Sequence, residues 1–175
     1  MTCIEKGIPY ELVPLAYGSP EHAALHPFTR MPIVEIDGLR LFESLAITGY
    51  LDESTGGPSL QPDQPRERLL MRTWMGVCSD YVYRDVVRTI PRGRAASEDE
   101  RTTALTALQR AEGMMGDTPF LAGEALTLAD LYLAPQIANC AEKAPELLDG
   151  LELIGAWAAR IGERESFRRT EPTPS

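Results

Sequence analysis

The sequence has few of the side chains that bind metal ions or form disulfide bonds. It contains two histidines, His22 and His26, and three cysteines, Cys3, Cys78 and Cys140, which lie far apart. Zinc sites are built from closely spaced pairs of such residues, and disulfide frameworks from an even number of cysteines in small secreted chains. We therefore expect no metal site, and cysteines that stay reduced in the cytoplasm.

The chain is also poor in positive charge and in long apolar runs. Seventeen lysines and arginines face 26 acidic residues, a formal net charge of -9. An acidic chain repels nucleic acids and anionic lipids. No apolar run approaches the ~18 residues of a membrane span, and the first residues lack a signal-peptide pattern. Neither nucleic acid nor membrane is expected as a partner.

A β-hairpin is the clearest local pattern. Apolar-rich segments 33–36 and 39–42 flank Asp37-Gly38, a turn that favours a two-residue hairpin. The turn sets the register, which pairs Ile36 with Leu39, Glu35 with Arg40, and Val34 with Leu41.

The elements around this hairpin are predicted from shorter patterns. Residues 10–14 alternate apolar and polar side chains and indicate a short strand. Ser19-Pro20 has the form of a helix start, and Ser44 can cap a helix to about residue 54. Residues 55–65 are rich in glycine and proline and indicate a linker.

After residue 65 the pattern is helical. A stripe at three- and four-residue steps runs through a long helix to about residue 88, and comprises Leu70, Trp74, Val77, Cys78, Tyr81 and Asp85. Ser97 with Glu100, and Thr127 with Asp130, have the spacing of capping boxes, to which we assign a role in folding. The predicted domains are 1–54, a 55–65 linker, and an all-helical 66–175 domain.

Two motifs carry a resemblance to a known family. Residues 26–32, the hairpin, and the segment Phe42-Glu43-Ser44-Leu45-Ala46-Ile47 resemble the thioredoxin-fold domain of cytosolic, bacterial-like glutathione S-transferases. Residues 120–130 resemble the helical domain of the same family. The resemblance implies an α/β thioredoxin-like N-terminal domain followed by an all-α C-terminal domain.

The resemblance also implies a glutathione site. Ser44 offers a hydroxyl and a helix N-terminus to the γ-glutamyl carboxylate, and Glu43 receives the ammonium group. The Met31–Pro32 bond is cis in the family, which exposes the backbone before Pro32 to the cysteinyl unit. Arg30 stands where the family has a basic residue near the glycyl end.

Some residues have two interpretations. Ser44 can be a helix cap only, and Glu43 a solvated acid. Trp74 and Tyr81 can line an electrophile pocket, although a stripe at helical spacing is more often core. Phe28 lies four residues before Pro32, like the aromatic residue that inserts between subunits in some family classes; local packing on the hairpin is the alternative.

The amino terminus departs from the family pattern. In the family a Tyr, Ser or Cys after the first strand activates the glutathione thiol, whereas Glu5-Lys6-Gly7 resembles the end of the first helix. No residue of this chain is therefore assigned as catalytic, Thr2 and Cys3 included. A misplaced start codon, a degenerate fragment or a partner chain that completes the sheet would each explain this. The normal pattern after Met1 favours the first.

The function implied is that of a glutathione transferase, with glutathione as co-substrate and no metal. In its intact form it conjugates the glutathione thiolate to a small electrophile, as a cytoplasmic, homodimeric detoxification enzyme. The alternative is a non-catalytic binding or assembly module of the same family. We expect the chain as given to be a poor catalyst.

Overall fold

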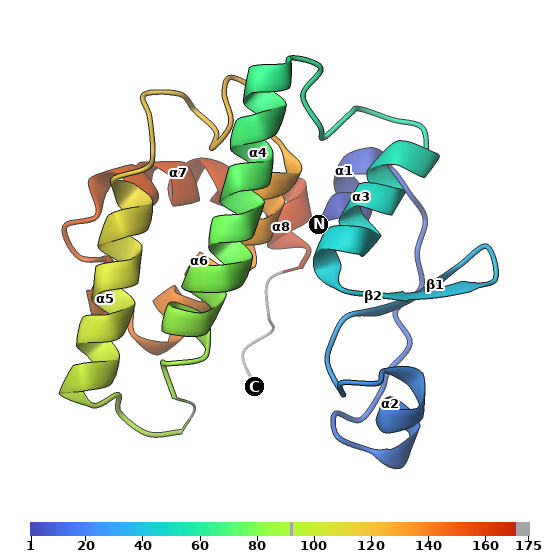
Figure 1. Cartoon of the computed structure of the whole chain (residues 1–175), viewed down its shortest axis with the longest axis horizontal. Helices are drawn as coiled ribbons and strands as arrows, with labels where there is room; N and C mark the ends of the chain where they lie inside the picture. The colour runs from blue at the N-terminus through green and yellow to red at the C-terminus, as the bar shows by residue number, and fades with distance from the viewer. Residues whose placement is uncertain (92, 171–175) are drawn as a thin grey trace. The chain divides into compact units, whose positions relative to one another are not determined.

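The computed structural model describes residues 1–91 and 93–170, which divide into two compact units (Figure 1). One unit is Thr2–Ser59, and the other begins at Leu60 and also takes in Met1. The division falls inside the glycine- and proline-rich segment 55–65. The chain therefore changes there from a mixed α/β unit to an all-helical one.

The predicted hairpin is present in the first unit. Strands β1 (Ile33–Ile36) and β2 (Leu39–Phe42) pair antiparallel in the register set by the turn, with Glu35 opposite Arg40. Arg40 Nη2 lies 2.8 Å from Glu35 Oε1. Asp37 and Gly38 have φ values of 50° and 76°, as a two-residue turn between twisted strands requires. Both the hairpin and its register are confirmed.

Three helices accompany the hairpin: α1 (Thr2–Lys6), α2 (Pro20–Leu25) and α3 (Ser44–Ser54). In Figure 1 the hairpin lies between α2 on one side and α1 with α3 on the other. A buried ion pair joins α1 to α3, since Lys6 Nζ lies 2.9 Å from Asp52 Oδ1. The same ammonium donates to the Asp52 and Pro58 carbonyls at 3.0 and 3.1 Å. Full hydrogen bonding is the condition under which a buried charge is tolerated.

The strand predicted for residues 10–14 is wrong. Leu12 and Val13 are 82% and 77% exposed, and the sheet within the described residues consists of β1 and β2. A strand forms only where its backbone pairs with a neighbouring strand, so alternation of side chains is not sufficient.

The elements described in the second unit are all helices. Its elements are α4 (Pro65–Val77), η1 (Cys78–Val87), α5 (Glu98–Glu112), α6 (Leu128–Lys143), η2 (Pro145–Leu148), α7 (Glu152–Gly162) and α8 (Glu165–Arg168). The long helix expected to about residue 88 is α-helical only as far as Val77 and π-helical from Cys78. In η1 the Arg88 N–H donates to the Tyr83 carbonyl, five residues earlier, at 2.9 Å.

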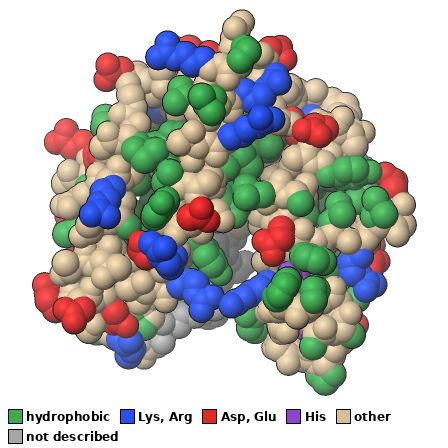
Figure 2. All heavy atoms as spheres, viewed as in Figure 1, with side chains coloured by type: hydrophobic (Ala, Val, Ile, Leu, Met, Phe, Trp, Pro, Cys, Tyr) green, Lys and Arg blue, Asp and Glu red, His purple; other side chains and the backbone are tan. Residues whose placement is uncertain are grey.

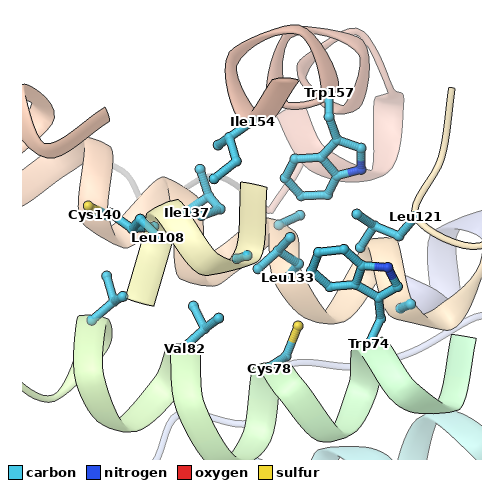
Figure 3. Close-up of a cluster of buried hydrophobic side chains, with 14 of the residues drawn as sticks. Trp74, Cys78, Val82, Leu108, Leu121, Leu133, Ile137, Cys140, Ile154 and Trp157 are labelled. Atoms are coloured by element: carbon cyan, nitrogen blue, oxygen red, sulfur yellow. The ribbon is translucent and has the colours of Figure 1, made fainter. Parts of the chain in front are cut away.

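A hydrophobic core surrounds α6 (Figure 3). Trp74, Cys78 and Val82 project from the continuous α4–η1 helix toward Leu133 of α6 in this view. Trp157 of α7 reaches the same core and is 4% exposed.

Both predicted capping boxes form. The Ser97 N–H donates to Glu100 Oε2 at 2.7 Å, and the Glu100 N–H donates to Ser97 Oγ at 3.3 Å. At the start of α6, Asp130 Oδ2 accepts the Thr127 N–H at 2.9 Å. The first residues of α5 and α6 are therefore stabilised as the sequence predicted.

Candidate functional site

The hairpin brings the predicted glutathione-binding residues to one place. Ile33 pairs with Phe42 at the end of the ladder away from the turn. Residues 30–32 lead directly into Ile33, and residues 43–44 follow directly after Phe42. The two segments therefore meet at the open end of the hairpin, although they are separated by the whole hairpin in sequence.

Glu43 has an unusual backbone conformation. Its φ and ψ are 72° and 112°, and it occupies the N-cap position of α3 without a capping hydrogen bond from its side chain. A positive φ in a residue that carries a Cβ atom is strained by about 1–3 kcal/mol and is often found at functional sites. Ser44 is consequently the first residue of the helix, so the prediction that Ser44 is its cap is wrong.

Polar groups at the start of α3 are left open. Among the residues the structure describes, neither the Ser44 hydroxyl nor the Glu43 carboxylate has a hydrogen-bond partner. The first N–H of α3 that has a hydrogen-bond partner in the helix is that of Ile47, which donates to the Glu43 carbonyl at 3.0 Å. The preceding N–H groups and the helix dipole favour an anion at this position.

The segment before β1 is exposed to solvent. Arg30, Met31 and Pro32 are exposed, with Met31 47% exposed. The Met31–Pro32 peptide bond is cis, as the resemblance implied. A cationic side chain, exposed backbone and a helix N-terminus thus belong to the same end of the hairpin.

Two buried histidines support this segment, in a role that their residue type, typical of metal ligands, does not indicate. His22 and His26 are 0% and 1% exposed. His22 Nε2 lies 2.9 Å from the Arg30 carbonyl oxygen, and the His26 ring lies 4.7 Å from the Phe42 ring. The sequence signal for this role was the helix start Ser19-Pro20, which places His22 in the first turn of α2.

The remaining candidates do not form one cluster. Trp74 is a core residue, 2% exposed, whereas Tyr81 is 54% exposed under the Arg84 guanidinium, 5.5 Å from its ring centroid. The two rings therefore lie in different environments, and a pocket role for Tyr81 stays a prediction. Phe28 is 70% exposed, with its ring edge-on to His26 at 6.3 Å between centroids, and its role as a subunit contact stays a prediction.

Cys3 lies in α1 and is half-buried. Burial raises the pKa of the Cys3 thiol, which keeps it protonated and weakly nucleophilic at neutral pH. Within residues 1–91 and 93–170, no three His, Cys, Asp or Glu side chains are grouped as metal ligands.

Comparison with known proteins identifies both units. Residues 2–53 match the N-terminal domain model of glutathione S-transferases, and residues 74–165 match the C-terminal domain model. Glutathione S-transferase F14 of Arabidopsis thaliana is 31% identical, over 96% of this chain and 76% of that protein. Maleylacetoacetate isomerase of Rhizobium meliloti (strain 1021) is 31% identical, over 95% and 84% of the two chains.

Solved structures agree with these sequence matches. Glutathione transferase F7 from Populus trichocarpa superposes with a TM-score of 0.82 at 26% identity, over 96% of this chain and 88% of that one. The fold is thus a thioredoxin-like unit followed by an all-α unit. The chain belongs to the glutathione S-transferase family.

Proposed function

We propose that the open end of the hairpin binds glutathione, and that the protein transfers it to a small electrophile. In that reaction the S–H bond of glutathione breaks and its proton passes to solvent. The thiolate sulfur then bonds to an electrophilic carbon, and a leaving group such as chloride departs with the electron pair of its broken bond to that carbon. The observation that carries the proposal is the start of α3, where a strained Glu43 presents open polar groups beside Ser44.

Each end of glutathione has a proposed partner. The γ-glutamyl carboxylate binds the Ser44 hydroxyl and the first N–H groups of α3, because a helix N-terminus attracts an anion. The Glu43 carboxylate accepts hydrogen bonds from the γ-glutamyl ammonium group. The guanidinium of Arg30 pairs with the glycyl carboxylate, and Met31 with Pro32 supplies the backbone between them.

The proposal extends to the cellular location and the oligomeric state of the protein. No helix in the described parts of the chain has the length and hydropathy to cross a membrane. With the expected reduced cysteines, we place the protein in the cytoplasm, where glutathione keeps thiols reduced. We further propose that it forms a homodimer.

Calorimetric titration with glutathione tests the site. Ser44→Ala removes the hydroxyl but keeps the backbone donors, so binding should weaken by about 1–2 kcal/mol, roughly five- to thirtyfold in Kd. Glu43→Ala should weaken binding comparably. Ser54→Ala is the matched control, because Ser54 lies at the other end of α3 and its hydroxyl donates only to the Tyr50 carbonyl. Unchanged affinity in both site variants would show that the site is misassigned.

Turnover separates the transferase from its alternative. The measurement is conjugation of glutathione to a chlorinated nitroaromatic substrate. Glutathione binding that depends on Ser44 together with conjugation supports a transferase. The same binding without conjugation, both by this chain and by a chain extended upstream of Met1, indicates a non-catalytic binding module.

A further inference from the structure

His22 is the most completely enclosed side chain beside the proposed site. It lies in α2, where Ser19 Oγ accepts its backbone N–H at 3.1 Å, and its side chain is 0% exposed. Almost no histidine surface is visible in Figure 2. A buried imidazole needs partners for its polar atoms, and both ring nitrogens of His22 have one.

The two partners define the tautomer of the ring. The Gly18 N–H donates to His22 Nδ1 at 3.0 Å, so Nδ1 carries a lone pair and no proton. The other nitrogen, Nε2, lies 2.9 Å from the Arg30 carbonyl oxygen, which can only accept. The ring is therefore the neutral Nε2–H tautomer, with Nε2 as the donor.

This hydrogen bond sets the orientation of the Arg30–Met31 peptide. A trans peptide is planar, and its carbonyl oxygen and its N–H point in opposite directions. The Arg30 oxygen points toward the buried His22 ring, so the Met31 N–H points away from it. Met31 is 47% exposed, and its N–H donates to no group within the described residues, so this N–H is available to a ligand.

We propose that His22 is a positioning residue of the glutathione site, acting through the Arg30 carbonyl. Its Nε2–H holds the Arg30–Met31 peptide with the Met31 N–H presented to the cysteinyl unit of the ligand. His22 itself does not contact the ligand. The inference rests on the proposed function, and it adds a residue of α2 to a site otherwise built from the two ends of the hairpin.

Substitution by the two amides separates the two hydrogen bonds of the ring. His22→Gln places an amide N–H near the position of Nε2, so it can still donate to the Arg30 carbonyl, but it loses the Nδ1 acceptor. His22→Asn places an oxygen near the position of Nδ1, so it can still accept the Gly18 N–H, but it does not reach Arg30.

Calorimetric titration of the full chain with glutathione measures both consequences. A loss of folded protein lowers the fitted stoichiometry, whereas a misplaced peptide raises Kd. We expect Kd to rise about tenfold in His22→Asn, as for one lost hydrogen bond, and to stay within about threefold of the original value in His22→Gln. Ser19→Ala is the control: it removes the cap of α2 and should lower stability without raising Kd.

Equal Kd values for the Asn and Gln variants would overturn the positioning role. If neither variant folds, nuclear magnetic resonance of the unaltered protein decides. The His22 ring should show a protonated Nε2 and an unprotonated Nδ1, and added glutathione should shift the Met31 amide resonance. A protonated Nδ1, or a Met31 amide unmoved at saturation, would overturn the proposal. Unchanged glutathione affinity in both Ser44→Ala and Glu43→Ala would instead overturn the site itself.

Discussion

Asp130 accepts four hydrogen bonds on one buried carboxylate. Besides the N–H and the hydroxyl of Thr127, at 2.9 and 3.0 Å, it accepts the Leu121 N–H and the Trp157 indole N–H, both at 2.9 Å. Burial raises the pKa of this carboxyl, while the hydrogen bonds act in the opposite direction. Asp130 therefore joins the start of α6 to α7 and to the loop before α6, which is more than helix capping alone requires.

Loss of this carboxylate should destabilise the helical unit strongly. Asp130→Ala leaves three buried N–H groups without an acceptor, so we expect the free energy of unfolding to fall by about 3 kcal/mol. Denaturant melts measure the change. Asp117→Ala is the control, because Asp117 is exposed, and it should stay within about 0.5 kcal/mol of the original protein. Equal melts for Asp130→Ala and the original protein would contradict the role.

At the scale of elements, helix starts follow local rules, while helix type and strand pairing do not. The capping boxes of α5 and α6 form as the sequence predicted. The helix that follows Pro65 becomes a π-helix at Cys78, although its apolar stripe has ordinary three- and four-residue steps. A side-chain stripe reports which face is buried, and it is too coarse to distinguish i+4 from i+5 backbone bonding.

The start of α5 should lose stability in acid. Its Glu100 carboxylate accepts two hydrogen bonds from the Arg94 guanidinium, at 2.6 and 2.8 Å, as well as the Ser97 N–H. The Arg94 hydrogen bond, followed by that of Ser97, lowers the pKa of Glu100 to about 2. A depressed pKa stabilises the folded state above the pKa of the unfolded chain, about 4.3 for glutamate. That contribution is lost as the pH falls toward about 2.

Urea melts over a pH series check this expectation. The stability difference between the original protein and Glu100→Gln should be constant near neutral pH and shrink below about pH 4.3. Glu98→Gln removes a charge from the same turn but leaves the Arg94–Glu100 pair intact. The stability difference between Glu98→Gln and the original protein should therefore not include the part that is lost below about pH 4.3. A Glu100→Gln difference that persists unchanged to the lowest measurable pH would argue against the ion pair.

At the scale of the whole molecule, Phe28 is the best candidate for a contact between subunits. Its ring is 70% exposed, two residues after the buried His26, whose Nδ1 accepts the Phe28 N–H at 3.1 Å. The loop backbone is thus anchored while the ring projects outward. A large, rigid apolar side chain on an anchored loop is typical of an interface anchor.

Sedimentation of Phe28→Ser tests the proposed homodimer. Removing a central aromatic anchor typically costs 2 kcal/mol or more of binding free energy, so the dimer dissociation constant should rise about thirtyfold or more. Leu12→Ser removes another exposed apolar side chain of the same unit and serves as the control. A dimer that is equally strong in both variants would exclude Phe28 as the contact.

Much of the molecule follows from sequence because the responsible contacts are local. The turn Asp37-Gly38 dictates the hairpin register, and a serine or threonine three residues before an acid dictates a capped helix start. The family motifs identified the fold, and the segments 30–32 and 43–44 were predicted as the glutathione site, a role that stays a proposal.

Tertiary structure decided what depends on groups distant in sequence. Residues 10–14 are not a strand because strand formation requires a paired neighbour. Trp74 is buried, 2% exposed, because helices from elsewhere in the chain pack on it. Glu43, and not Ser44, is the cap of α3 because β2 enters the helix through a positive φ. His22 acquires its partner from the loop that returns over α2, since only the folded chain brings its Nε2 to the Arg30 carbonyl.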